Sequence, residues 1–410
     1  MIETQFDIKK VNAFKDLLVR IRHGESPQSI QKDFEKYFKE VSEVNLLLII
    51  QELLNGDYGV TIEDIKKFYS IYTHLNDEAI FDSFDQSHPV QIFRTENRSF
   101  QSLLEKIDLL LEVYETQEND DKNTINDLRK YIHQLGEFQK HYRRKEHLFF
   151  SILERFNHHV PTRIMWRQDD RNYALYKGVK RQIDQLPQVD LNHVLKTYSA
   201  FKKEFYDMIF QEEEIILPIL VSLFSDDDWS AIAEESDAFG YALIKIEEQL
   251  PQRDGWRENS SMEVEEYSTR NFPFDSGYLT LEEANLILNN LPLEITFVDK
   301  NSIFKYFNNI TKASDMMFIR TPVSLGRNVA NCHPPKSLKK VMTIVRDLKT
   351  KKRTSESMWF KKGDQYIHTT FKAIFNEKDE FLGILEYVQD IQPFFELPSE
   401  VKTGLTKLDE

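Results

Sequence analysis

Apolar residues recur every three or four positions through the first 250 residues of the chain, a spacing that is typical of amphipathic helices. In the first set, between residues 8 and 78, the pattern is punctuated by Gly24, Ser26-Pro27 and Gly56, which are helix stop and start signals. We therefore predict a small module of short helices. Its apolar positions are Val11, Phe14, Leu17, Leu18, Ile21, Ile30, Phe34, Phe38, Ile65, Phe68, Ile71 and Leu75.

Four longer helical patterns follow, separated by short loops that are polar or contain proline. The first begins near His88 and ends before residue 117, and the others cover about 124–156, 163–185 and 191–223. Long helices joined by short loops predict an antiparallel four-helix bundle. Ser225 then resembles an N-cap, so we expect further helix up to about residue 250.

The pattern changes after residue 250. Prolines, glycines and serines are scattered among charges, which is typical of an interdomain linker. Beyond it we predict a helix, two strands around an Asp-Lys-Asn-Ser turn, further helical segments and three closing strands, hence an α+β domain. The expected organisation is multidomain: an all-α module at 1–80, the bundle at 81–250, a linker at 251–277, the α+β domain at 278–398 and a tail at 399–410.

One ionisable residue interrupts the apolar face of each bundle helix. His141 shares its face with Phe138, Leu148 and Ile152, and a buried imidazole needs a hydrogen bond, a carboxylate or a metal. Each such residue could be a separately satisfied core residue. A single shared site explains all of them together, because imidazole and carboxylate groups from facing helices hold iron or manganese in bundles. The four residues are His88, His141, Asp169 and Glu212.

Composition narrows the classes of protein that remain. The net charge of −15 and the pI near 5.3 argue against nucleic-acid binding, which needs a basic footprint. The single cysteine, Cys332, excludes an intramolecular disulfide and fits a reducing compartment. The chain starts without a signal-peptide pattern, and no segment has the ~20 apolar residues of a membrane span. We therefore expect a soluble cytoplasmic protein that binds neither membrane nor nucleic acid.

Several motifs resemble those of a known family. His88-Pro-Val, His141-Tyr-Arg-Arg-Lys-Glu146 and Glu212-Glu-Glu-Ile-Ile-Leu-Pro-Ile-Leu220 are similar to the hemerythrin-like, HHE cation-binding family. The whole chain resembles the bacterial DUF438 proteins, which join a DUF438 helical region, a hemerythrin-like bundle and a C-terminal PAS domain. Further markers are Ile164-Met165-Trp166 with Asp169-Asp170, Phe239-Gly-Tyr-Ala-Leu-Ile244 and Asn331-Cys-His-Pro-Pro-Lys-Ser337. This resemblance implies a metal site in the bundle and a PAS fold for the α+β domain.

The ligand set departs from the family pattern. Hemerythrin-like helices usually carry a His followed four residues later by Glu or Asp, whereas His141 is followed at that spacing by Lys145, with Glu146 next. The other departures are Met208 four residues before Glu212, Gln91 where a second His is common, and Asp169 where a His is usual. The resemblance therefore implies one iron ion, an incomplete di-iron site or none, with Glu146 as a further candidate ligand. An inward-pointing Lys145 should pair with Glu212 or Asp169, because an unpaired buried ammonium is costly.

In the C-terminal domain, Cys332-His333-Pro-Pro is the sharpest motif. It could be a structural loop with a small buried cysteine, or Cys332 and His333 could bind haem or another cofactor. Large apolar side chains on the predicted strands would enclose a pocket for a small ligand. The expected walls are Ile295, Phe297, Ile367, Leu382 and Ile384, with Tyr306 and Phe371 nearby.

Three hypotheses for the function follow. The first is a cytoplasmic sensor or regulatory protein, whose bundle responds to iron, oxygen, nitric oxide or redox state and whose PAS domain binds a ligand or forms a homodimer. The second is a metal-free interaction protein that contacts a protein partner, with Lys145 supplying the charge of a metal. The third is a di-metal oxidase or peroxidase, which the incomplete ligand set disfavours. We find no phosphate-binding loop and no Ser/His/Asp set, so we expect no enzyme activity.

Overall fold

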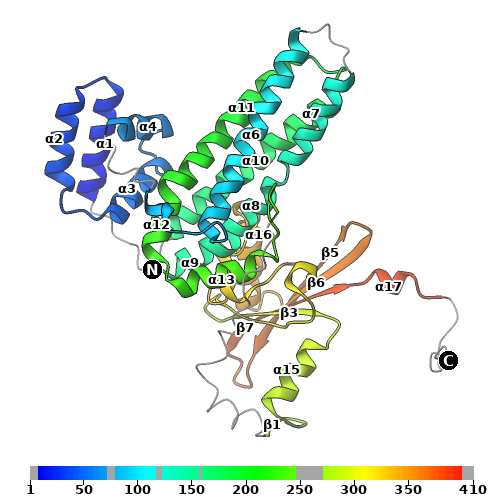
Figure 1. The fold of residues 1–410 in the computed structure, drawn as a ribbon. Coiled ribbons are helices and arrows are strands. Elements are labelled where there is room, and N and C mark those ends of the chain that lie inside the picture. The colour runs from blue at the N-terminus through cyan, green and yellow to red at the C-terminus, as the bar shows by residue number, and fades with distance from the viewer. Residues whose placement is uncertain (1–7, 72–78, 117–121, 157–158, 246–270, 399–410) are drawn as a thin grey trace. The chain divides into compact units, whose positions relative to one another are not determined.

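The computed structural model describes residues 8–71, 79–116, 122–156, 159–245 and 271–398. Contacts between residues divide the chain into two compact units (Figure 1). The first is helical and contains Met1–Arg253 together with two later segments, Thr321–Arg327 and Asn331–Ser337. The second contains the remaining C-terminal residues and is built around a sheet. The predicted fold class, helical regions followed by an α+β domain, is confirmed.

The N-terminal module of the helical unit is built on aromatic packing. Phe14 of α1 meets Phe68 of α4 edge to face, with ring centroids 4.9 Å apart, and both rings contact Phe34 of α2. Helix α2 begins as predicted, because the Ser26 side chain accepts a hydrogen bond from the Ser29 amide and Pro27 is the first helical residue. The helices are α1 (Ile8–Arg22), α2 (Pro27–Phe38), α3 (Glu43–Asn55), α4 (Ile62–Ile71) and the short α5 (Ala79–Asp82).

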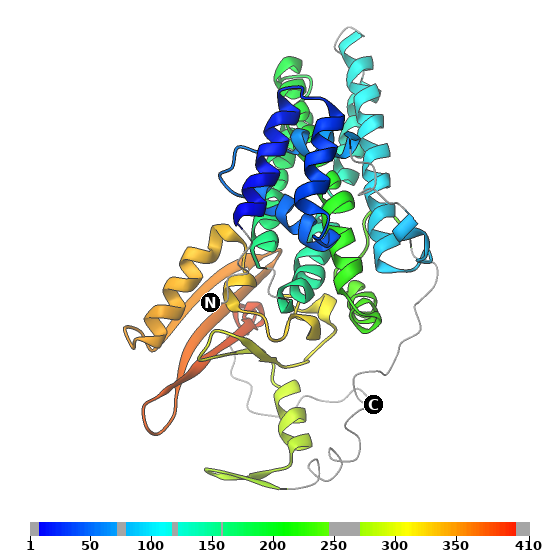
Figure 2. The same cartoon turned by 90° about the vertical axis from the view of Figure 1, so that its left-hand side faces the viewer.

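The predicted antiparallel bundle is present (Figure 1, Figure 2). Its long helices contact one another in a ring in which α6 touches α7 and α11, and α10 touches the same two helices. Helix α3 of the N-terminal module packs against α10 and α12. The helices are α6 (Pro89–Thr116), α7 (Lys122–Leu135), α8 (Phe138–Arg144), α9 (Phe150–Arg155), α10 (His159–Asp184), α11 (Leu191–Gln211), α12 (Leu217–Leu223) and α13 (Asp226–Ser236).

Two of the predicted bundle helices are interrupted. The segment predicted as one helix at 124–156 breaks at Gly136, where a Cβ atom would lie 2.2 Å from the hydroxyl of Tyr176. That hydroxyl donates a 3.0 Å hydrogen bond to the Ile132 carbonyl, so glycine is needed for the close approach. Both interrupted helices also contain a π-helical turn, a feature that is frequent at functional sites. The turns are η2 (Lys145–Phe149) and η3 (Glu212–Ile216).

Two segments from later in the sequence complete the helical unit. The buried Arg327 guanidinium donates to both carboxylate oxygens of Glu154, at 2.7 and 3.0 Å, and to the Glu146 carbonyl in η2, at 3.1 Å. The Val323 amide donates to the Glu235 carboxylate at 3.1 Å. Bound in this way, segments that lie far along the chain become part of the helical unit.

The C-terminal unit is an antiparallel five-stranded sheet of order β4-β3-β7-β6-β5, with helix α16 packed on its core. Residues 272–279, most of which fall in the predicted linker, form a hairpin instead, and residues 313–315 form a single 3₁₀ turn. The elements are β1 (Phe272–Phe274), β2 (Gly277–Leu279), α15 (Leu281–Asn289), β3 (Glu294–Asp299), β4 (Phe304–Phe307), α16 (Pro335–Lys349), β5 (Ser355–Lys362), β6 (Gln365–Phe375), β7 (Phe381–Asp390) and α17 (Gln392–Phe395).

The predicted pocket walls do not lie on one face of the sheet. Ile295 and Phe297 pair with Tyr387 and Leu385, which alternate with Ile384 along β7, so these two residues lie on the face opposite Ile384. Ile384 is buried with Leu348 of α16 and Ala373 of β6, but Leu382 is 41% exposed. The pairing of β6 with β7 shifts register after Ile374, which pairs with Gly383, and Leu382 is skipped. Leu382 therefore falls outside the expected alternation.

Candidate functional site

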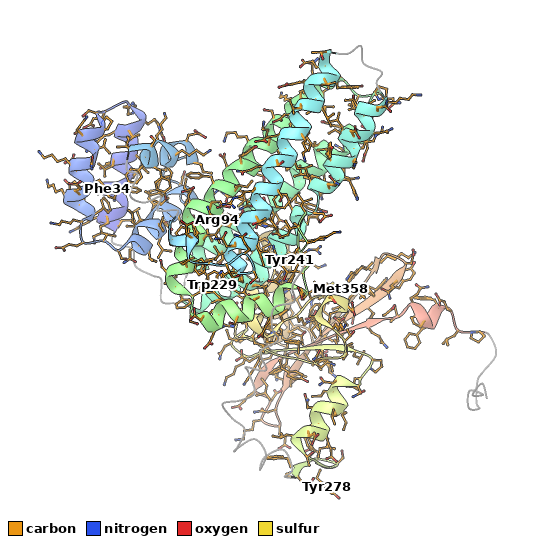
Figure 3. All side chains as sticks on the ribbon, viewed as in Figure 1. Phe34, Arg94, Trp229, Tyr241, Tyr278 and Met358 are labelled. Carbon is orange, nitrogen blue, oxygen red and sulfur yellow. The ribbon has the colours of Figure 1, made fainter. Side chains whose placement is uncertain are left out.

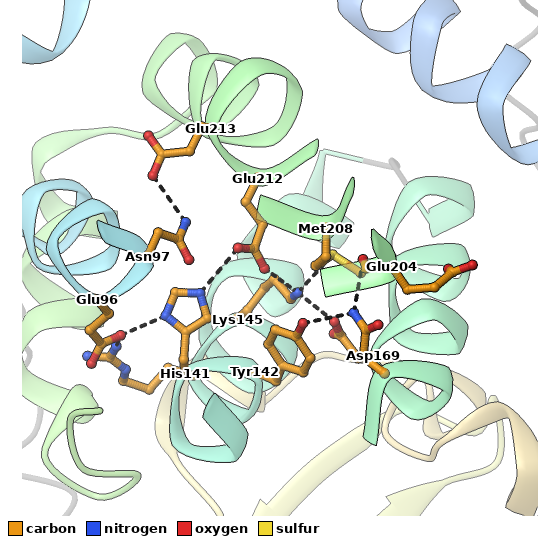
Figure 4. Close-up of polar contacts among 12 residues, drawn as sticks. Glu96, Asn97, His141, Tyr142, Lys145, Asp169, Glu204, Met208, Glu212 and Glu213 are labelled. Atoms are coloured by element: carbon orange, nitrogen blue, oxygen red, sulfur yellow. Dashed lines mark hydrogen bonds and ion pairs between the residues drawn. The ribbon is translucent and has the colours of Figure 1, made fainter. Parts of the chain in front are cut away.

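His141 lies in the middle of the bundle and is fully buried. Its ring stacks on Phe93 with centroids 3.6 Å apart, and both ring nitrogens face carboxylates. Nδ1 lies 2.7 Å from Glu96 Oε2, and Nε2 lies 3.3 Å from Glu212 Oε2 (Figure 4). Burial opposes protonation, but the charges of Glu212 and Glu96 outweigh it and raise the pKa of His141. The two neighbouring carboxylates thus favour the protonated form of the ring.

Lys145 lies one turn further along the same helix and points inward, also fully buried. Its Nζ donates to Glu212 Oε1 at 2.6 Å and to Asp169 Oδ1 at 2.7 Å, which confirms the pairing expected for this lysine (Figure 4). The same nitrogen lies 3.5 Å from Met208 Sδ and 4.1 Å from the centre of the Tyr142 ring. Burial lowers the pKa of Lys145, but the two carboxylates outweigh burial, so the pKa is raised.

The two carboxylates that share Lys145 differ in their charge. Burial would raise the pKa of Glu212, but the cations Lys145 and His141 outweigh it and hold that pKa at about 2. Asp169 contacts only one of these cations. Burial, reinforced by the charge of Glu212, outweighs Lys145 and raises the pKa of Asp169 to about 7. Glu212 is therefore the fixed anion at the centre of the site.

Glu146, the further candidate ligand, is buried beside Asp169. Burial and the negative charge of Asp169 raise its pKa well above the ordinary value, despite the neighbouring Lys145. A neutral Glu146 carboxyl is the cheaper form at such a site, because a second uncompensated anion would be costly. In this buried network three basic side chains, His141, Arg144 and Lys145, contact the carboxyl groups of Glu96, Asp169 and Glu212.

Glu96 of α6 is a central residue that the sequence analysis did not identify. It is fully buried, and its Oε2 accepts hydrogen bonds from His141 and from Arg144. Its other oxygen accepts the Ala242 backbone amide at 2.6 Å. A signal was present, because Glu96 lies three residues after Phe93 and four before Phe100, on the inward stripe of that helix.

The structure does not bring His88 into this network. His88 precedes the first residue of α6, eight residues before Glu96, which corresponds to about 12 Å along a helix. Its half-buried ring stacks on Phe84, with centroids 4.0 Å apart, and contacts Trp229. Gln91, at the position where a second His is common, instead donates to the Phe81 carbonyl at 2.7 Å. The first bundle helix therefore contributes Glu96 in place of the predicted histidine.

The arrangement does not fit a metal ion. Within the described parts of the chain, no three or more His, Cys, Asp and Glu side chains are grouped so that they could hold one. The ammonium of Lys145 lies between Asp169 and Glu212, where their oxygens would have to face a metal. Both nitrogens of His141 are directed at carboxylates, which leaves no ring lone pair for a ligand bond.

The second candidate pair, Cys332 and His333, lies in the segment Asn331–Ser337, which belongs to the helical unit rather than to the sheet. Both residues are partly buried. Burial and the positive charge of Arg327 lower the pKa of His333, which favours its neutral form. This placement does not support their expected role as the polar anchor of a ligand in the core of the sheet.

Three parts of the chain match known protein families. Residues 88–220 match the hemerythrin HHE cation binding domain, and residues 284–392 match a PAS domain. Residues 14–81 match a family of unknown function, DUF438. The chain thus carries a DUF438 region, a hemerythrin HHE domain and a PAS domain, as the sequence motifs predicted.

The C-terminal part is also similar to solved structures. A C-terminal domain from Streptococcus mutans is 49% identical, with a TM-score of 0.31, and the match covers 32% of this chain and 99% of that chain. A sensory box sensor histidine kinase from Vibrio cholerae is 14% identical (TM-score 0.21, 27% and 90% covered). A PAS domain from Colwellia psychrerythraea is 16% identical (TM-score 0.22, 28% and 98% covered). No curated protein matches the chain. None of the described helices is long and apolar enough to cross a membrane.

Proposed function

We propose that this chain is a non-catalytic, cytoplasmic regulatory protein whose hemerythrin-like bundle works without a bound metal. The observation that carries the proposal is the position of Lys145 Nζ, 2.6 Å from Glu212 and 2.7 Å from Asp169. An ammonium supplies the positive charge that two buried carboxylates require, and a second cation in the same place would meet repulsion. The bundle therefore has a permanent internal cation instead of an exchangeable one.

The regulatory part of the proposal is supported by the combination of domains. A PAS domain follows the bundle, and such a domain offers a ligand-binding or dimerising surface. In this proposal the signal passes to a protein partner, or to a second copy of the chain, through contact. Iron, oxygen, nitric oxide and haem are then not the inputs of the bundle.

The test is metal content and its dependence on Lys145. Wild-type protein, loaded with ferrous iron under anaerobic conditions and then desalted, is expected to retain far less than one ion per chain by elemental analysis. Its thermal unfolding midpoint should not change with iron. Lys145→Glu supplies a carboxylate beside Asp169, Glu146 and Glu212, so iron should bind this variant and raise its midpoint.

Lys130→Glu is the matched control, because it makes the same charge change at an exposed site on α7. This variant should behave like the wild type. Retention of about one iron ion per chain by the wild-type protein would overturn the proposal and favour the metal sensor. That result does not depend on whether Lys145→Glu folds.

A further inference from the structure

Residues 237–245 of the helical unit follow α13 directly and form what we call the exit strap. Several residues of the strap contact the bundle. Phe239 stacks on His147 with centroids 5.4 Å apart, and the ring of Tyr241 lies 4.8 Å from the guanidinium carbon of Arg144. Ala242 is fully buried. Figure 3 shows Tyr241 at the end of the bundle where Trp229 lies.

A continuous series of polar contacts joins the strap to the centre of the network. Lys145 Nζ contacts Glu212 at 2.6 Å, and Glu212 contacts His141 at 3.3 Å. His141 contacts Glu96 at 2.7 Å, and Glu96 accepts the Ala242 amide at 2.6 Å. One oxygen of Glu96 therefore faces the buried cations, and the other holds the strap. Loss of a cation on one side would therefore leave the Glu96 carboxylate, which accepts the strap amide on the other side, less firmly positioned.

The attachment is opposed by backbone strain. Leu243 has φ 61°, in the left-handed region that costs a non-glycine residue about 1 kcal/mol or more. Its amide donates to Glu137 at 3.3 Å, so this bond and the Ala242 bond to Glu96 offset the strain. Packing is also incomplete, because Arg144 and Tyr241 line a cavity of about 10 Å³, the space of roughly one water molecule. The strap is thus held by a small set of specific contacts, of which the bond to Glu96 reaches the buried network.

We infer that Glu96 couples attachment of the exit strap to the integrity of the buried ion network. The strap leads directly into residues 246–270 and so to the C-terminal unit, which begins at Asp254. If the strap detached, its nine residues would lengthen the connection to the C-terminal unit by at most about 30 Å when fully extended. The coupling rests on the proposed regulatory function and describes how a change in the bundle would be passed on. It does not require that the bundle be free of metal.

Hydrogen–deuterium exchange of the full-length protein tests the coupling, with mass spectrometry of the peptide that covers the strap. Lys145→Met alters the network at its far end without touching the strap. We expect the amides of Ala242 and Leu243 to exchange about tenfold faster than in the wild type, the change that about 1.4 kcal/mol produces. Amides of α1, a helix of the N-terminal module that contributes no residue to the network, should keep their wild-type rates. Glu96→Gln should have the same effect on the strap with little change in side-chain shape.

Ile183→Val is the control for general destabilisation, because Ile183 is fully buried in α10 and belongs to no polar contact of the network. The inference is overturned if Lys145→Met speeds exchange in the strap no more than Ile183→Val does, or if the amides of the strap and of α1 accelerate together. If Lys145→Met does not fold, Glu96→Gln decides by the same comparison. Metal content tests the proposed function and exchange tests the coupling, so one can fail while the other holds.

Discussion

Phenylalanine rings fill the core of the N-terminal module, whereas the middle of the bundle buries four carboxyl groups and three basic side chains. In the module, Phe14, Phe34 and Phe68 contact one another at centroid distances of 4.9 to 6.0 Å. In the bundle, the equivalent space is occupied by His141, Lys145 and their anionic partners. The two cores belong to one helical unit but depend on different physics.

Apolar packing is not directional, so a core of phenylalanines tolerates changes that preserve volume. A buried ion pair is less forgiving. The free-energy cost of desolvating both ions offsets much of their Coulomb attraction, and the loss of one partner leaves an uncompensated buried charge. In the ion network, the position of each side chain therefore depends on its charged partners. The aromatic core of the N-terminal module stabilises the fold in a way that tolerates substitution.

The largest effect should come from removing the central anion. Glu212→Ala leaves Lys145 and His141 each short of a partner, and we expect a loss of about 3–5 kcal/mol in the free energy of unfolding. Urea denaturation followed by circular dichroism measures it. Glu234→Ala, at an exposed position on α13, should change the free energy by less than about 0.5 kcal/mol. Similar losses for the two variants would break the comparison.

A smaller effect is expected in the aromatic core. Phe68→Leu keeps an apolar side chain at a fully buried position and should cost about 1–2 kcal/mol. The same urea titration measures it. The two cores differ as expected if Phe68→Leu lowers the free energy of unfolding by less than half as much as Glu212→Ala does. A cost equal to that of Glu212→Ala would show that the module is as intolerant as the network.

The smallest effect concerns pH. Burial, followed by the positive charges of Arg327 and Arg143, lowers the pKa of His147 to about 3. Because the unfolded chain takes up a proton near pH 6.5 while the folded bundle keeps this ring neutral, the contribution of His147 falls as the pH drops below about 6.5. Between pH 7.5 and 6.0 the loss is about 1 kcal/mol.

His147→Phe retains a ring that can stack on Phe239 and removes the titrating group. The difference in unfolding free energy between pH 7.5 and 6.0 should therefore shrink by about that amount in this variant. An unchanged pH dependence would mean that His147 already takes up its proton in the folded state.

Much of the fold could be predicted from the sequence because helices that bury one face repeat it every three or four residues. That pattern placed the bundle helices within a few residues, and the three strands expected to close the C-terminal domain are β5, β6 and β7. The π turns η2 and η3 were not predicted, since an inserted residue keeps its neighbours helical and leaves no composition signal. The hairpin formed by β1 and β2 lay in a stretch whose prolines and glycines are equally typical of a linker.

The candidate site was predicted only in part. Asp169, Glu212 and His141 were correctly placed on inward faces, and the pairing of Lys145 followed from the cost of a lone buried charge. His88 was misplaced in the interior because the apolar stripe was extended back past the start of α6. The bond from Ala242 to Glu96 joins residues 146 positions apart through a backbone amide, which no side-chain pattern reveals.

The helical unit is not a continuous piece of sequence, and this bears on how such proteins can be divided or recombined. Glu154 receives its guanidinium from Arg327, 173 residues further along, and Glu235 receives an amide from Val323. A gene that ended after residue 253 would encode α1 to α13 and still omit both donors, leaving the buried Glu154 carboxylate without its counter-charge. We therefore expect the helices and the later segments of this unit to be inherited together and not exchanged as separate modules.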